Sequence, residues 1–155
     1  SSNYGTNAVV TLGKNASNNE YWGLFKIPTF TVPPGETLTQ VRLNLTRFNT
    51  DTAATLKLYT VNGPWSEAAV TGLTVPARTH VRDVSYTGGT AESSITLDIT
   101  DVYNASNGIA LWRDSTAAAY TQYYTSDEAT TSRRPTIEVT SAGAPPPFRG
   151  WGLPL

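Results

Sequence analysis

The stretch LTQVRLNLTRF at residues 38–48 alternates apolar and polar side chains almost without a break. Val41, Leu43 and Leu45 would face one way, whereas the polar residues between them would face the other. This two-residue period is typical of a β-strand with one buried and one exposed face. The stretch decides the fold because shorter runs of the same kind recur along the rest of the chain.

Working outward from this strand, similar runs recur every ten to fifteen residues, and turn-forming Gly and Pro (12 and 10 residues) separate them. The 25 Thr residues suit half-exposed strands, and no amphipathic helix is visible. We therefore expect an all-β fold, an antiparallel β-sandwich, jelly-roll-like, with nine or ten short strands. The run at 108–113 is nearly all apolar, which predicts a strand buried on both faces. The expected strands are 8–12, 21–27, 38–48, 56–61, 81–86, 95–99, 108–113, 120–125 and 136–140.

Composition excludes several classes of function. The chain has 155 residues, no Cys and one His, which excludes disulfide scaffolds, thiolate zinc sites, cysteine nucleophiles and multi-histidine metal centres. With a net charge of −1, strong electrostatic attraction to nucleic acid or to an anionic membrane is not expected. No apolar run is long enough to insert into a bilayer. We expect no metal and no cofactor.

The last part of the chain has a different character. Residues 1–141 form the predicted β-sandwich module, whereas 142–155 form an extended Pro-rich tail that opens on Ala-Pro-Pro-Pro. Its apolar residues cannot make a core of their own. We expect a docking segment that binds other chains of the same assembly, although a disordered end is the alternative. The chain lacks an initial Met, so we expect Ser1 to be a processing boundary. The predicted docking residues are Phe148, Arg149, Trp151, Leu153 and Leu155.

Two groups of side chains are candidate ligand-binding residues. Sugar sites pair aromatic rings with polar groups, so Trp22, Tyr120, Tyr123 and Tyr124 are candidates, the alternative being that they fill the core. Alternation places Tyr120, Gln122 and Tyr124 on one face of their strand. Likewise, Arg78, His80 and Arg82 would share a face that binds uronic-acid carboxylates, or is merely solvated. No catalytic motif accompanies either group, so no catalytic residue is assigned.

Nine short motifs follow one another between residues 3 and 140. They are Asn3-Tyr4-Gly5, Trp22-Gly23-Leu24-Phe25-Lys26-Ile27, Pro33-Pro34-Gly35, Val41-Arg42-Leu43-Asn44-Leu45, Trp65-Ser66-Glu67-Ala68-Ala69-Val70-Thr71, Leu97-Asp98-Ile99-Thr100-Asp101-Val102, Gly108-Ile109-Ala110-Leu111, Ser126-Asp127-Glu128 and Arg134-Pro135-Thr136-Ile137-Glu138-Val139. In this order they resemble the DNRLRE domain family (disaggregatase-related repeats), which overlaps a class of alginate-binding carbohydrate-binding modules. Two residues of the family's pattern are replaced here, the Arg of the motif at 22–27 and the second Trp of the motif that begins at Trp65.

This resemblance implies a secreted or surface β-sandwich module that is not an enzyme. Combined with the aromatic tail, it predicts an extracellular structural and attachment module of a filament or virion surface, in contact with other chains and with polysaccharide. The alternative is a stand-alone carbohydrate-binding module of a secreted polysaccharide-degrading protein. The expected location is extracellular, on a cell surface or on a virion surface.

Overall fold

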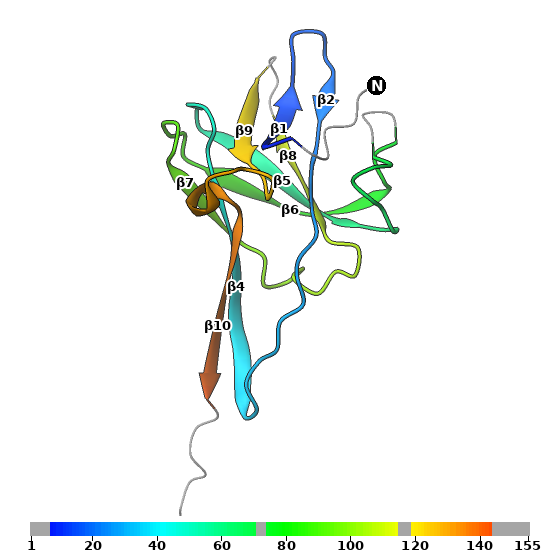
Figure 1. Ribbon diagram of the computed structural model, residues 1–155. Coiled ribbons are helices and arrows are strands. Elements are labelled where there is room, and N and C mark those ends of the chain that lie inside the picture. The colour runs from blue at the N-terminus through cyan, green and yellow to red at the C-terminus, as the bar shows by residue number, and fades with distance from the viewer. Residues whose placement is uncertain (1–6, 71–73, 115–118, 144–155) are drawn as a thin grey trace, which may run out of the picture.

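The computed structural model describes residues 7–70, 74–114 and 119–143, and within them it confirms an all-β antiparallel β-sandwich (Figure 1). The predicted tail residues 144–155 lie outside the described part, and so do residues 1–6. Turns, longer loops such as the one between β3 and β4, and a 3-10 turn, Thr131–Arg133, connect the strands of the described ranges. No helix in the described ranges has the length and apolar character needed to cross a bilayer. The strands are β1 Val9–Lys14, β2 Glu20–Tyr21, β3 Gly23–Phe25, β4 Glu36–Thr46, β5 Ala54–Val61, β6 Arg78–Tyr86, β7 Ser94–Asp98, β8 Ile109–Asp114, β9 Tyr120–Tyr124 and β10 Thr136–Gly143.

The described strands pair into three antiparallel sheets, in the orders β2-β1-β9, β10-β4-β7 and β3-β8-β5-β6. An isolated bridge between Arg47 and Tyr123 joins the end of β4 to β9, so the first two sheets meet there. β4 and β10 continue as a two-stranded ribbon that extends away from the body of the molecule (Figure 1).

The core confirms the alternation that predicted β4. Val41, Leu43 and Leu45 are buried, and they pack with Leu56 and Leu58 of β5 and with further apolar residues of the opposing strands. In β8 five of the six residues are buried, as expected for a strand covered on both faces. The long strand expected at 21–27 is instead interrupted at Trp22, where the chain passes from the β2-β1-β9 sheet to the β3-β8-β5-β6 sheet.

One polar network lies inside the sandwich. The side chains of Arg47 and Asp51 are 4% and 0% exposed, and the Arg47 Nε to Asp51 Oδ1 distance is 2.9 Å. Tyr86 and Thr121 both donate hydroxyl hydrogen bonds to Asp51 Oδ2, at 3.0 and 2.6 Å. Arg47 also donates to the carbonyl oxygen of Thr87 at 2.8 Å. Buried charges are tolerated only when they are paired and hydrogen-bonded, so this network fixes the loops that follow β4 and β6 against strand β9.

Candidate functional site

Trp22 is the residue around which the candidate site is built. It lies between β2 and β3, and its half-buried side chain reaches the outer side of the β3-β8-β5-β6 sheet. One face of its indole lies against Trp112 of β8, with ring centroids 5.6 Å apart and the planes 20° from parallel. Tyr59 from β5 packs edge-to-face against Trp22, with ring centroids 5.2 Å apart. The interruption of the expected strand thus places Trp22 over two neighbouring strands.

Cationic side chains lie on this aromatic cluster. The guanidinium carbon of Arg78 is 3.5 Å from the centroid of Trp22, and the Nζ atoms of Lys14 and Lys57 are 5.4 and 5.8 Å from that of Trp112. Each of these contacts lies within the range of a cation–π interaction. We call the cluster of Lys14, Trp22, Lys57, Tyr59, Arg78, His80 and Trp112 the stacked face.

The cations of the stacked face differ in their partners. Lys57 donates to Asp114 at 2.9 Å, and this hydrogen bond raises the pKa of the Lys57 ammonium. The Nε2 atom of His80 lies 2.7 Å from Oδ1 of Asp83. The His80 and Tyr59 rings pack edge-to-face, with centroids 5.2 Å apart. Arg78 donates to the carbonyl oxygen of Pro76 at 3.1 Å, and no carboxylate of the described residues pairs with it. Among the cations of the stacked face, Arg78 is therefore the one that has no carboxylate partner in the described part of the chain and could receive an external anion.

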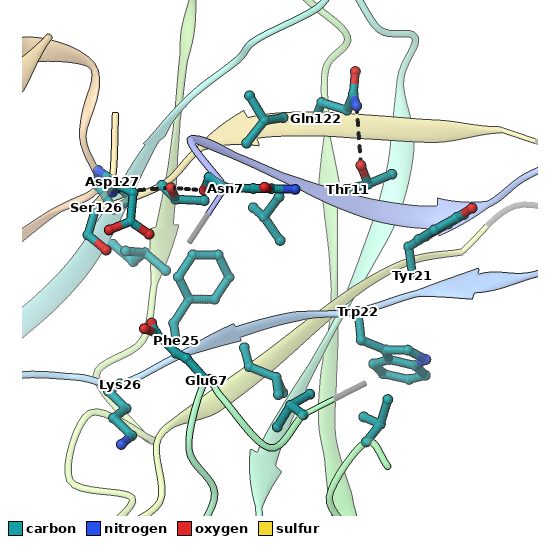
Figure 2. A pocket seen from close by; sticks show the side chains of 18 of the residues that line it. Asn7, Thr11, Tyr21, Trp22, Phe25, Lys26, Glu67, Gln122, Ser126 and Asp127 are labelled. Carbon is teal, nitrogen blue, oxygen red and sulfur yellow. Dashed lines mark hydrogen bonds between the residues drawn. The ribbon is translucent and has the colours of Figure 1, made fainter. Parts of the chain in front are cut away.

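A cleft of about 1480 Å³ begins at Trp22 and continues along β1, β3 and β9 (Figure 2). Its lining mixes apolar residues such as Phe25 with polar ones such as Gln122. Figure 2 shows Tyr21 and Trp22 at one end, Ser126 and Asp127 at the other, and Asn7 between them. Mixed linings of this kind suit ligands that have both apolar and hydroxyl-bearing surfaces.

The β9 strand contributes its outward face to the cleft. Tyr120 is 47% exposed and lines the cleft together with Gln122, whose amide donates to Thr11 Oγ1 at 3.2 Å. Two residues further along, Tyr124 is buried, since Phe48 lies edge-to-face against it at 5.5 Å. Tyr124 donates to Glu92 at 2.6 Å, and this hydrogen bond raises the pKa of its hydroxyl.

The structure separates the predicted ligand-binding residues into two sets. Trp22, Arg78 and His80 belong to the stacked face, and Tyr120 lies in the adjoining cleft. Tyr123 does not belong to an exposed row, because it is 0% exposed and burial raises the pKa of its hydroxyl.

Two further expectations need correction. Tyr124 has the predicted orientation but is covered by Phe48, so its ring offers no open platform. Arg82 does not share a face with His80, because the register of β5 and β6 shifts: Leu58 pairs with Arg82, whereas Tyr59 pairs with His80. Arg82 instead donates to Asp101 and to the carbonyl oxygen of Asp98.

Sequence reasoning missed the contributions of Lys14, Lys57, Tyr59 and Phe48. The alternation of β5 contained a usable signal, since Lys57 and Tyr59 flank the buried Leu58. No such signal joined Lys14 to Trp112, because their contact depends on how two sheets meet. The predicted docking residues Phe148, Arg149, Trp151, Leu153 and Leu155 lie outside the described residues. Within the described ranges no group of three or more His, Asp or Glu side chains could hold a metal ion.

Comparison with known families adds evidence that is independent of the site geometry. The model of carbohydrate-binding module family 96 matches residues 1–141, which include strands β1 to β9 and most of β10. A comparison with curated proteins finds no match. The match supports the carbohydrate-binding part of the resemblance seen in the sequence, whereas the relation to the DNRLRE domain remains a prediction.

Proposed function

Because this chain belongs to carbohydrate-binding module family 96, we propose that it binds an anionic polysaccharide at the stacked face and the adjoining cleft, without catalysing a reaction. The proposal places Arg78 against a carboxylate of the polysaccharide and Tyr120 against a sugar ring. Trp22 holds the two parts together, since it lines the cleft and also carries Arg78.

The observation that carries the proposal is that Arg78 is held against Trp22 and has no carboxylate partner among the described residues. Its guanidinium carbon lies 3.5 Å from the centroid of the Trp22 ring, and this contact limits its rotamers before any ligand binds. Its one hydrogen bond to the described residues runs from Nη1 to Pro76, and its Nε is buried without a partner among them, so the donors of Nη2 remain for a carboxylate. Arginine binds carboxylates through two parallel N–H donors, a geometry that suits the carboxylate of a uronic acid.

Tyr120 supplies the second kind of contact. A pyranose ring has an apolar face of C–H groups, and an exposed aromatic ring can cover it. Beside Tyr120, the side chains of Thr11 and Gln122 offer hydroxyl and amide groups to sugar hydroxyls. The anionic, uronic-acid polysaccharides proposed as ligands are components of cell surfaces and extracellular matrices, so the proposal also places the module outside the cell.

The role of the module in a larger assembly is a separate part of the proposal. A filament or virion-surface attachment module and a stand-alone binding module of a polysaccharide-degrading protein would both use the site described above. The first depends on docking by residues 142–155, which no contact of the described residues supports. We therefore base the tests on polysaccharide binding.

We expect the chain to be retarded by alginate and polygalacturonate in affinity electrophoresis, and not by hydroxyethylcellulose. Replacing Arg78 with Gln removes a charge-assisted hydrogen bond, and we expect the affinity to fall about 10- to 100-fold. Tyr120→Ala should weaken binding about tenfold, because a ring contact is lost. Added salt should weaken binding of the wild type, because the partners carry opposite charges.

The matched control is Arg42→Gln, since Arg42 lies exposed on β4, where it pairs with Glu138 at 3.7 Å. This substitution removes the same charge and should leave binding unchanged. Equal retardation by the neutral glucan, or equal losses in the Arg42 and Arg78 variants, would show that the stacked face does not recognise the carboxylates.

A further inference from the structure

Two exposed rings lie at the outward face of β9. One belongs to the strand, and the other lies beside it. Phe48, Tyr120 and Val139 are the large hydrophobic residues that stand exposed among the described ones, at 46%, 47% and 39%. Phe48 follows the bridge that joins Arg47 to Tyr123, and its N–H donates to the carbonyl oxygen of Gln122 at 2.8 Å. The Phe48 ring therefore lies beside the same strand that carries Tyr120.

The spacing of the two rings follows from strand geometry. Tyr120 and Tyr124 point to the same side of β9, four residues apart, which corresponds to about 13 Å along the strand. The backbone of Phe48 lies opposite Gln122, because the preceding residue is bridged to β9 and the Phe48 N–H donates to the carbonyl oxygen of Gln122. The Phe48 ring contacts that of Tyr124, so the ring lies towards the Tyr124 end of this interval. Between the ends lies Gln122, with its amide bound to Thr11. The face thus presents a ring, a pair of polar groups and a second ring, and a monosaccharide cannot span them.

Phe48 is held in place before any ligand binds. Its ring stands at 82° to that of Tyr124, and Tyr124 is fixed in turn by Glu92, whose Oε1 accepts a hydrogen bond from the Tyr124 hydroxyl at 2.6 Å. Arg133 covers Tyr124 at 5.1 Å and pairs with Glu92 at 2.8 Å. A ring that is already immobilised loses little entropy on binding, which favours affinity. An exposed Phe with this much support is better suited to contact a ligand than to fill space.

We propose that Phe48 forms a second sugar-stacking subsite, and that a linear polysaccharide lies along β9 from Tyr120 to Phe48. The inference rests on the proposed function, and it adds the direction of the bound chain and a minimum ligand length. Its occupant is a glycan because Tyr120 and Gln122 of the row also line the cleft and because the centre of the row is polar. The proposal predicts that affinity rises with oligosaccharide length until both rings are covered.

The test compares the affinities of the wild type and of Phe48→Ala for oligomannuronates, oligogalacturonates and cello-oligosaccharides of two to eight residues, by calorimetry. We expect wild-type affinity to increase with length. In Phe48→Ala the affinity for the longest oligomers should fall about tenfold, whereas that for the shortest stays the same. Phe48→Trp should restore the dependence on length. Val139→Ala is the matched control, since Val139 is similarly exposed but lies on β10.

The possible outcomes separate the two proposals. If the wild type binds long oligomers and Phe48→Ala retains the full dependence on length, the second subsite is excluded while the proposed function stands. If the wild type binds none of the three series, the proposed function fails and this inference fails with it. If Phe48→Ala alters affinity equally at every length, its effect is structural and the subsite is again excluded.

Discussion

Replacing Asp51 with Ala should lower the free energy of unfolding by about 3–5 kcal/mol, the range measured when one partner of a buried ion pair is removed. The Asp51 side chain is fully buried and accepts hydrogen bonds from Arg47, Tyr86, Thr121 and the N–H of Gly89. Its loss leaves the Arg47 guanidinium without a counter-charge and two hydroxyl groups without an acceptor. Urea denaturation followed by far-UV circular dichroism measures the change.

Two further variants make this test specific. Glu138→Ala removes a carboxylate from an exposed pair with Arg42, and we expect a loss of at most about 1 kcal/mol. Thr121→Val removes one hydrogen bond to Asp51 while keeping the shape of the side chain, and we expect a loss of about 1–3 kcal/mol. A similar small loss in the Asp51 and Glu138 variants would contradict the view that the buried network stabilises the fold.

The network also matters for the candidate site. Thr121, which binds Asp51, alternates along β9 with Tyr120 and Gln122 of the outward face. Arg47 bridges β4 to β9 and precedes Phe48. The inward contacts of these segments therefore set the position of the rings that face outward, and a weakened network should reduce glycan affinity as well as stability.

The sequence predicted what depends on periodicity within one strand. Alternation in β4 and the apolar run of β8 identified buried strands, and alternation in β9 separated Tyr120 from the buried Tyr123 and Thr121. Periodicity alone cannot say which of two faces is the covered one. For that reason the sequence predicts Tyr123 as a sugar-binding ring, whereas the structure buries it completely.

What the sequence did not predict depends on contacts between strands. Arg82 and His80 of β6 are separated by a register shift that falls between Leu58 and Tyr59 of β5. Neither strand's sequence indicates this shift by itself. Trp22 meets Trp112 only because the chain changes sheets at that residue. The sequence predicts Phe48 only as the end of a strand. The ring that supports it, Tyr124, lies far away in the sequence, on another strand.

Replacing Gly108 with Ala should destabilise the protein by about 2–5 kcal/mol, the sum of two costs. Gly108 has φ +79°, a conformation that costs other residues about 1–2 kcal/mol. A Cβ atom there would also lie 2.2 Å from the carbonyl oxygen of Phe25, a backbone atom that cannot rotate away. Phe25 pairs with Ile109, so relief of the overlap must push β3 from β8. We expect glycan affinity to fall as well, because β3 continues directly from Trp22.

Gly35→Ala separates the two costs. Gly35 has φ +83°, almost the same as Gly108, yet no atom lies within 4 Å of a Cβ added there. It should therefore show only the conformational cost of about 1–2 kcal/mol and unchanged glycan binding, since it lies in the turn before β4. Thermal and urea denaturation of both variants give the difference. If the two losses are equal, the close approach of β3 to Gly108 does not resist displacement, and the position of Trp22 must depend on its ring contacts instead.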